Sequence, residues 1–214
     1  MKLRWRFALL LVYPILKLSL GVKVKGKEQL SQVGGKIIVA NHTSNFDPVL
    51  LGFVIRRELW FLAKEELFNY RKWFSWLIRF WNAYPLKRGV GDSGLFRTCS
   101  QLLRKNKTLI FFPEGTRNRT DTLLPFKPGL GLLAVINSVP VVPCHIYGIG
   151  NSFISKIVDP DINPGKIRLG DLFSSRITVK FGNPIPPDGF KRNRTDYENF
   201  ADKIRNAVEE LNNK

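Results

Sequence analysis

The stretch Asn41-His42-Thr43-Ser44-Asn45-Phe46-Asp47-Pro48 decides how the rest of the chain is arranged. Before it, residues 36–40 (KIIVA) form a short apolar run behind two glycines, which predicts a buried strand. After it, residues 49–55 (VLLGFVI) predict a helix. The polar octet therefore lies on a strand-to-helix turn, and ligands of open α/β sheets bind at that end of the strands.

The spacing of His42 and Asp47 indicates that their side chains meet. On one continuous helix, residues five apart would point about 140° away from each other, so the chain must turn between them. Pro48 suits the first position of a helix, which makes Asp47 the predicted N-cap. A carboxylate on one imidazole nitrogen fixes the tautomer and leaves the other nitrogen as a base. An ordinary helix cap beside a loop histidine is the alternative that this stretch leaves open.

Composition favours one folded domain with an anionic partner. The chain has 214 residues, 44% of them hydrophobic, and a formal net charge of +17. Such a charge suits nucleic acid, an anionic lipid surface or phosphorylated substrates. The 16 phenylalanines and five tryptophans favour a membrane surface, although a solvated basic surface over an aromatic core has the same composition. The spacing of Cys99, Cys144, His42 and His145 does not fit a zinc site, and a count of only two cysteines argues against a disulfide framework.

Residues 1–20 are treated as a segment separate from the domain at 21–214. Their apolar run is about half of the ~20 residues that span a bilayer, and Pro14 should kink or divide a helix there. We expect two short helices lying in the membrane interface. A signal peptide with a poor cleavage site and a buried N-terminal helix are the two alternatives.

The remaining pattern predicts a single α/β domain whose mostly parallel, mixed sheet is flanked by helices. Core or buried strands are expected at 60–64, 108–112 and 139–147, with a late strand at 177–181, and the alternation at 22–26 is compatible with an edge strand. Helices are expected at 65–82, 93–105 and 130–136. A capping-box pattern at Thr195–Glu198 opens a last helix to about Asn212. In the helix at 65–82 the aromatic residues cover too wide an arc for one buried stripe, so some should face acyl chains.

Two further polar or basic segments follow predicted strands. They carry Arg88 and Arg117, with Lys87, Arg119 and Lys127 nearby. Arginine forks match phosphate oxygens at two points, and a base beside a phosphate pocket suits deprotonation of a hydroxyl on a phosphorylated substrate. The chain has neither a Gly-x-Ser-x-Gly elbow nor a phosphate-binding P-loop, so a serine acyl-enzyme and an NTPase are disfavoured.

Four blocks together resemble the glycerolipid acyltransferases, which include the 1-acyl-sn-glycerol-3-phosphate acyltransferases. His42 to Asp47 resembles the family's His-x-x-x-x-Asp signature, and residues 112–117 (FPEGTR) are similar to its second hallmark. Residues 126–129 (FKPG) and 139–143 (VPVVP) are similar to the blocks that follow. The blocks occur in the family order over roughly residues 36–148. The segment around Arg88 fits the family pattern only loosely, which puts the acceptor headgroup in doubt more than the reaction.

The resemblance implies a reaction and a set of site residues. His42, held by Asp47, would deprotonate the sn-2 hydroxyl of 1-acyl-sn-glycerol-3-phosphate, which would attack the thioester of acyl-carrier protein or acyl-CoA to form phosphatidic acid. Glu114 would orient Arg117 or the glycerol hydroxyl. The implied phosphate-binding residues are Arg88, Glu114, Gly115, Thr116, Arg117 and Lys127.

The resemblance further implies a phospholipid-synthesis enzyme on the cytoplasmic face of a membrane, peripheral or monotopic, with membrane lipids as partners. It needs no metal and no cofactor apart from the acyl donor. Another lysophospholipid or glycerol-3-phosphate remains open as the acceptor. A basic lipid- or nucleic-acid-binding module without chemistry is a further alternative. It is disfavoured because such modules do not need carboxylates beside the cationic site. The sequence does not indicate an oligomeric state.

Overall fold

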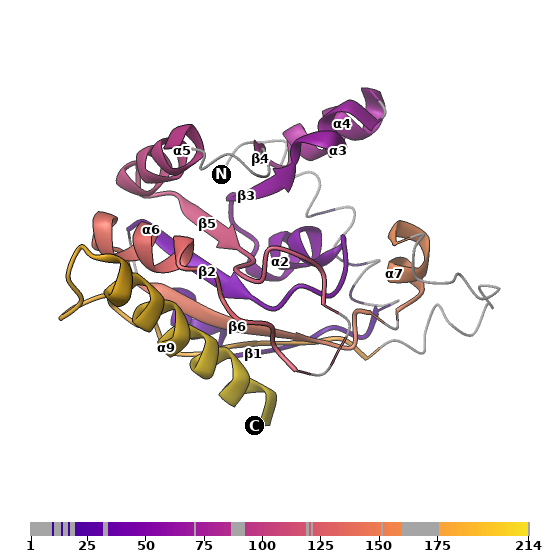
Figure 1. Ribbon diagram of the computed structural model, residues 1–214. Helices are drawn as coiled ribbons and strands as arrows, with labels where there is room; N and C mark the ends of the chain where they lie inside the picture. The colour runs from indigo at the N-terminus through magenta and orange to yellow at the C-terminus, as the bar shows by residue number, and fades with distance from the viewer. Residues whose placement is uncertain are drawn as a thin grey trace.

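The computed structural model in Figure 1 describes residues 10, 14, 17, 20–31, 34–70, 72–86, 93–118, 120, 122–150, 152–159 and 176–213. Its strands are β1 (Lys23–Lys25), β2 (Lys36–Ala40), β3 (Leu59–Lys64), β4 (Ala83–Leu86), β5 (Thr108–Phe111), β6 (Val141–Tyr147) and β7 (Thr178–Phe181). Its helices are η1 (Lys27–Leu30), α2 (Asp47–Ile55), α3 (Glu65–Tyr70), α4 (Lys72–Phe80), α5 (Ser93–Arg104), α6 (Gly129–Asn137), α7 (Phe153–Val158) and α9 (Arg194–Asn213).

The seven strands form one sheet in the order β1-β7-β6-β2-β5-β3-β4. All pairings are parallel except that between β6 and β7, which confirms the predicted mostly parallel, mixed sheet. In β2, Ile37 pairs with Leu109 of β5 on one side and Val141 of β6 on the other. Parallel neighbours end at the same edge, so the loops after β2, β5 and β6 lie together. The expected edge strand near the N-terminus is β1.

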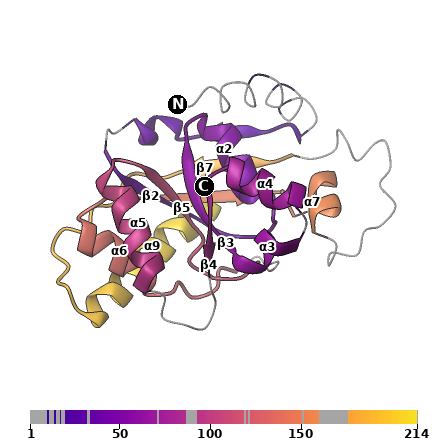
Figure 2. The same cartoon turned by 90° about the horizontal axis from the view of Figure 1, so that it is seen from above.

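Helices cover both faces of the sheet, as Figures 1 and 2 show. Alternate residues of β2 enter two separate cores, because successive side chains of a strand point to opposite faces. Ile38 packs on the face covered by α2, while Ile37 packs on the face covered by α5, α6 and α9. This double burial explains why the central strands are continuously apolar rather than alternating.

Two helix predictions need correction. The helix predicted at 65–82 is two helices, α3 and α4, followed directly by the turn into β4. The predicted capping box at Thr195 is wrong, because α9 begins one residue earlier. The Asn193 side chain accepts a hydrogen bond from the backbone N–H of Asp196, while Glu198 pairs with Arg194. The cap therefore lies two residues before the predicted one.

Most of the N-terminal segment lies outside the described residues, including the predicted interface helices of 1–20. Leu10, Pro14, Lys17 and Leu20 are described, all in helical conformation, and Leu20 is fully buried in the core under α2. Among the described residues, no helix has the length and apolarity needed to cross a membrane.

Candidate active site

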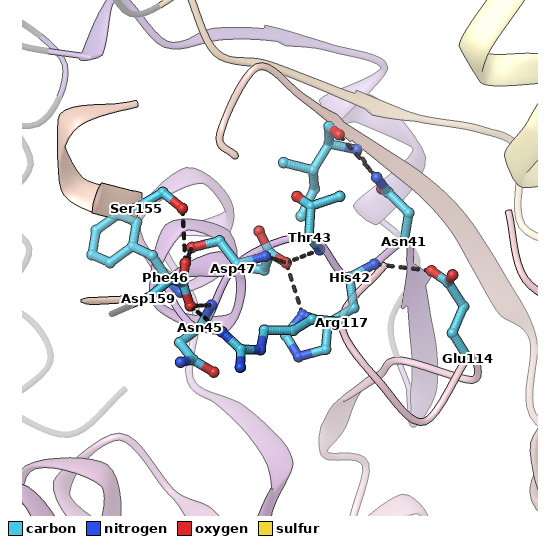
Figure 3. Close-up of polar contacts among 12 residues, drawn as sticks. Asn41, His42, Thr43, Asn45, Phe46, Asp47, Glu114, Arg117, Ser155 and Asp159 are labelled. Carbon is cyan, nitrogen blue, oxygen red and sulfur yellow. Dashed lines mark hydrogen bonds and ion pairs between the residues drawn. The ribbon is translucent and has the colours of Figure 1, made fainter. Parts of the chain in front are cut away.

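The turn after β2 is closed by a single carboxylate oxygen. Asp47 Oδ2 accepts hydrogen bonds from His42 Nδ1 at 2.8 Å, from the backbone N–H of Thr43 at 2.8 Å and from that of Ser44 at 2.9 Å (Figure 3). The prediction that Asp47 caps α2 is wrong. The helix begins at Asp47, Phe46 precedes it, and that terminus has no side-chain cap. The carboxylate bonds backward to the turn, which is the geometry that brings it to His42.

The Asp47 contact fixes the chemical state in which the imidazole is useful. A carboxylate on Nδ1 holds the proton there, so Nε2 carries the lone pair of a base. The His42 ring also stacks on Phe112, with 4.3 Å between ring centroids. Asp47 is fully buried, whereas the His42 side chain keeps 18% of its surface exposed. The imidazole is therefore held by a buried carboxylate and is itself partly exposed.

The loop after β5 is tied to the His42 turn by Glu114. Its Oε1 accepts from the backbone N–H of His42 at 3.1 Å, and its Oε2 accepts from the Asn118 amide at 3.0 Å and from the backbone N–H of Leu124 at 3.2 Å. The Asn118 N–H in turn donates to the His42 carbonyl at 2.6 Å. Glu114, predicted to orient Arg117 or the glycerol hydroxyl, thus holds the backbone of His42.

Gly115, Thr116 and Lys127 lie together beside this loop. Gly115 has a φ of 71°, a conformation that favours glycine, and a β-carbon there would lie 2.5 Å from Lys127 Nζ. The backbone N–H of Lys127 donates to the Pro113 carbonyl at 3.0 Å. Gly115, Thr116 and Lys127 are all exposed, so the loop and its cation are accessible to a ligand.

Arg117 reaches the same turn from the β5 loop. Its Nη1 lies 2.7 Å from Asp159 Oδ1, and Asp159 also accepts from the backbone N–H of Asn45 at 3.0 Å (Figure 3). The structure thus brings Arg117, Glu114, His42 and Asp47 together, as predicted. Arg88, the second predicted phosphate ligand, lies outside the described residues. Asp159 was not predicted, since no motif marks it and it lies 114 residues beyond Asn45.

Both cysteines are unsuited to nucleophilic catalysis. Burial raises the pKa of the Cys99 thiol to about 12. Burial, with the charge of Asp47 as a smaller cause, raises the pKa of Cys144 well above its usual value. Both groups stay protonated near neutral pH, and a thiol is a poor nucleophile in that state. Burial and protonation together argue against a role for either cysteine as a nucleophile.

The fold and the site together define an α/β domain with a carboxylate-held histidine and an arginine at the carboxyl edge of its sheet. A histidine held in this way can take a proton from a hydroxyl as a general base. In the parts of the chain that the structure describes, no cluster of three or more His, Cys, Asp or Glu side chains has a geometry able to hold a metal ion.

Comparisons with known proteins give the family. Residues 21–147 match the family model described as acyltransferase. The chain is 32% identical over 135 residues to a 1-acyl-sn-glycerol-3-phosphate acyltransferase of Bacillus subtilis, covering 63% of this chain and 66% of that protein. It is 30% identical over 203 residues to a protein of the same name from Saccharomyces cerevisiae, covering 92% and 62%. The chain belongs to the acyltransferase family.

A solved structure agrees with this assignment. The crystal structure of the 1-acyl-sn-glycerophosphate acyltransferase of Thermotoga maritima matches with a TM-score of 0.69 at 27% sequence identity. The match covers 98% of this chain and 82% of that one. The chain spans 66%, 60% and 62% of the length of the curated relatives from Bacillus subtilis, Streptococcus pneumoniae and Saccharomyces cerevisiae.

Proposed function

We propose that this chain transfers a fatty acyl group from a thioester, acyl-carrier protein or acyl-CoA, to the sn-2 hydroxyl of 1-acyl-sn-glycerol-3-phosphate at a membrane surface. The product is phosphatidic acid. Supporting this are the relatives' names, the His42–Asp47 pair and the cations on the neighbouring loop. The thioester is the only co-substrate in the proposed reaction, which uses neither a metal nor an organic cofactor.

In the proposed mechanism His42 Nε2 takes the proton of the acceptor hydroxyl. The resulting alkoxide attacks the thioester carbonyl carbon and forms a tetrahedral intermediate. Its collapse breaks the carbon–sulfur bond, and the departing thiolate recovers the proton from His42. Asp47 stabilises the imidazolium throughout, because its Oδ2 lies 2.8 Å from Nδ1. General-base catalysis of this kind contributes roughly 10²–10⁴-fold.

The acceptor phosphate is assigned to the loop after β5. Arg117 offers a planar guanidinium that matches phosphate geometry, and Lys127 adds a second cation over Gly115. Glu114 contributes indirectly by fixing the backbone of His42 relative to this loop. Arg88 is assigned to the same phosphate from its place in the sequence, following the family pattern.

The observation that carries the proposal is the 2.8 Å contact between His42 Nδ1 and a fully buried Asp47. It leaves Nε2 as the base, and the side chain keeps 18% of its surface exposed beside the cationic loop. A module that only binds anions gains nothing from burying a carboxylate behind an imidazole. The arrangement suits proton transfer from a hydroxyl on a phosphorylated molecule.

The test is an acceptor panel with the purified protein in mixed micelles. It would include 1-acylglycerol-3-phosphate, glycerol-3-phosphate and other lysophospholipids, each with acyl-CoA and acyl-carrier protein, analysed by lipid mass spectrometry. His42→Ala should lose at least about 10²-fold in kcat while keeping its thermal transition. His145→Gln is the matched control, because it removes the only other histidine of the chain and should retain turnover. Near-normal transfer by folded His42→Ala would refute the mechanism.

A further inference from the structure

Asp159 has a role that neither the motifs nor the proposed chemistry assigns. We propose that Asp159 is a positioning residue that aims Arg117 at the acceptor phosphate and thereby selects phosphorylated over unphosphorylated acceptors. The inference rests on the proposed function and names the residue that determines one part of its specificity. Asp159 comes directly after α7, outside all four sequence blocks.

Asp159 is fully buried, and both of its carboxylate oxygens accept hydrogen bonds. Oδ1 accepts from Arg117 Nη1 at 2.7 Å and from the Asn45 N–H at 3.0 Å. Oδ2 accepts from the hydroxyls of Ser44 at 2.6 Å and Ser155 at 2.7 Å. A fully buried carboxylate with four donors is built into the fold rather than placed there by a chance surface contact.

The four donors connect three separate parts of the site. Ser44 and Asn45 belong to the turn that carries His42 and Asp47, Arg117 belongs to the loop after β5, and Ser155 lies on α7 itself. The Asn45 amide also donates to the Val158 carbonyl at 3.2 Å, so α7 is fastened to the turn by backbone and side chain. Asp159 therefore fixes where Arg117 lies relative to the base.

This placement matters because a guanidinium is rigid and directional. Its five N–H groups form a planar fork, so a carboxylate on Nη1 sets the direction of the whole group. The Arg117 side chain retains 22% exposure although its partner is buried. An arginine ordered before the acceptor binds loses less freedom when it binds the phosphate. Asp159 thus strengthens binding of acceptors that carry a phosphate and leaves binding of acceptors without a phosphate unchanged.

The test compares acceptors in the wild type and Asp159→Asn. The amide keeps the shape and can still bond to the turn, but it removes the charge opposite Arg117. We expect KM for 1-acylglycerol-3-phosphate to rise about tenfold, with kcat and the thioester KM within about threefold of wild type. The kcat/KM for 1-acylglycerol, which has no phosphate, should not change. A purely structural role would instead lower turnover of both acceptors together.

A double-mutant cycle with Arg117→Lys tests whether Asp159 acts through the arginine. Arg117→Lys alone should raise the same KM about tenfold, because lysine lacks the planar fork. If Asp159 acts only by aiming Arg117, the double variant should resemble the single ones instead of combining to about a hundredfold. Additive effects would overturn the assignment.

Ser152→Ala is the matched control for loosening of α7. Ser152 is buried and caps the same helix by accepting from the Ser155 N–H at 3.2 Å, but the Ser152 hydroxyl does not bond to Asp159. It should lower the thermal transition and leave the acceptor KM unchanged. If Asp159→Asn does not fold, Ser155→Ala, which removes one donor from Oδ2, should raise that KM about threefold.

The outcomes separate this inference from the proposed function. If the wild type acylates neither acceptor, the proposed function fails. If the wild type prefers the phosphorylated acceptor and Asp159→Asn, or Ser155→Ala in its place, leaves that preference unchanged, only the role of Asp159 is overturned.

Discussion

Asp47 combines two tasks in one atom. Its Oδ2 holds the proton-bearing nitrogen of His42 and also accepts the backbone N–H groups of Thr43 and Ser44. Its Oδ1 is buried and has no hydrogen-bond partner among the described residues. Within the described part of the chain, the hydrogen bonds of the carboxylate are therefore all on one side, where it orients the His42 ring and closes the turn at the same time.

Replacing Asp47 with asparagine removes the negative charge and keeps the size of the side chain, so it separates the effect of the charge from the effect of the hydrogen bonds. The amide oxygen can still accept from the turn, so we expect a folded protein with a lower thermal transition. Its kcat should fall at least about 10²-fold, because a neutral amide does not stabilise the imidazolium that forms when His42 takes the proton. Steady-state kinetics and calorimetry would measure both effects. Asp188→Asn, an exposed aspartate before α9, is the control and should match the wild type in both.

His145 makes stability depend on pH. Burial, with the charge of Lys180 as a smaller cause, lowers the pKa of this histidine to about 4. The unfolded chain therefore binds a proton between about pH 6.5 and pH 4 that the folded chain does not, so acidification favours unfolding across that window. Urea unfolding of His145→Gln should show a shallower loss of stability over this range. Equal slopes in both proteins would show that His145 does not titrate as described.

The residues of the site differ in how well the sequence predicts them. The spacing within five residues predicts that His42 and Asp47 meet if the chain turns between them, but not that Asp47 bonds back to this turn instead of capping α2. The bond from Glu114 to the His42 backbone spans 72 residues and depends on β2 pairing with β5. Asp159 lies farther still and has no motif, so nothing local indicates that it contacts Arg117.

At the scale of elements, the site is a consequence of strand order. The sequence predicts β2, β5 and β6 from their apolar runs, but the order in which they pair is a property of the folded sheet. Because β5 and β6 both flank β2 in parallel, the loops after all three strands converge at one edge. The prediction of one helix at 65–82 was wrong because aromatic residues occur in both α3 and α4. The apolar pattern therefore gives no sign of where α3 ends and α4 begins.

Asn41 fastens the end of β2 to β6. The Asn41 side-chain N–H donates to the Ile146 carbonyl at 3.0 Å, and the Asn41 side-chain carbonyl accepts from the Ile146 N–H at 2.8 Å. These two bonds continue the hydrogen bonding between β2 and β6 beyond the end of β2. Asn41→Ala would leave both Ile146 backbone groups buried without partners. We expect a loss of about 2–4 kcal/mol in the free energy of unfolding, measured in urea, and faster hydrogen exchange at Ile146.

The control for this change is Asn137→Ala at the end of α6. Asn137 is only partly buried, and its amide donates to Ser100 and to its own helix at Leu133. Its removal should cost less than about 1.5 kcal/mol. An equal loss in both variants would mean that the contact between β2 and β6 contributes nothing special to stability.

At the scale of the whole molecule, one surface combines exposed aromatic and basic groups. Phe68, Asn69, Lys72, Ser75, Trp76 and Arg79 line an open hollow of about 450 Å³ over α3 and α4. Trp76 is 64% exposed, and the Arg79 guanidinium lies 5.0 Å from the centre of the Phe68 ring. The sequence of α4 contains no acidic residue. A tryptophan between cations suits the headgroup level of a membrane, which agrees with the proposed lipid acceptor.

The last prediction concerns binding of this surface to anionic vesicles. Lys72→Glu with Arg79→Glu lowers the formal charge from +17 by four, since each substitution changes it by two. A basic residue near an anionic surface contributes about 1 kcal/mol, so the double variant should float with phosphatidylglycerol-containing liposomes at least about tenfold more weakly. Wild-type flotation should weaken as salt rises, because exposed charges are screened. Trp76→Ala should weaken flotation at high salt, where the aromatic contribution remains.

The matched control changes the same charge elsewhere. Lys191→Glu with Arg192→Glu alters two exposed cations in the loop before α9, far from α4 in Figures 1 and 2. If net charge alone drives binding, both double variants should lose the same affinity for the vesicles. If the α4 surface drives binding, only the Lys72 and Arg79 variant should lose affinity. Deleting residues 1–19 in each background, which keeps the buried Leu20, measures what the N-terminal segment adds. Without the N-terminal segment, any contribution of α4 to membrane binding should be visible in flotation. Full flotation of the Lys72 and Arg79 variant after this deletion would therefore exclude α4 as a membrane contact.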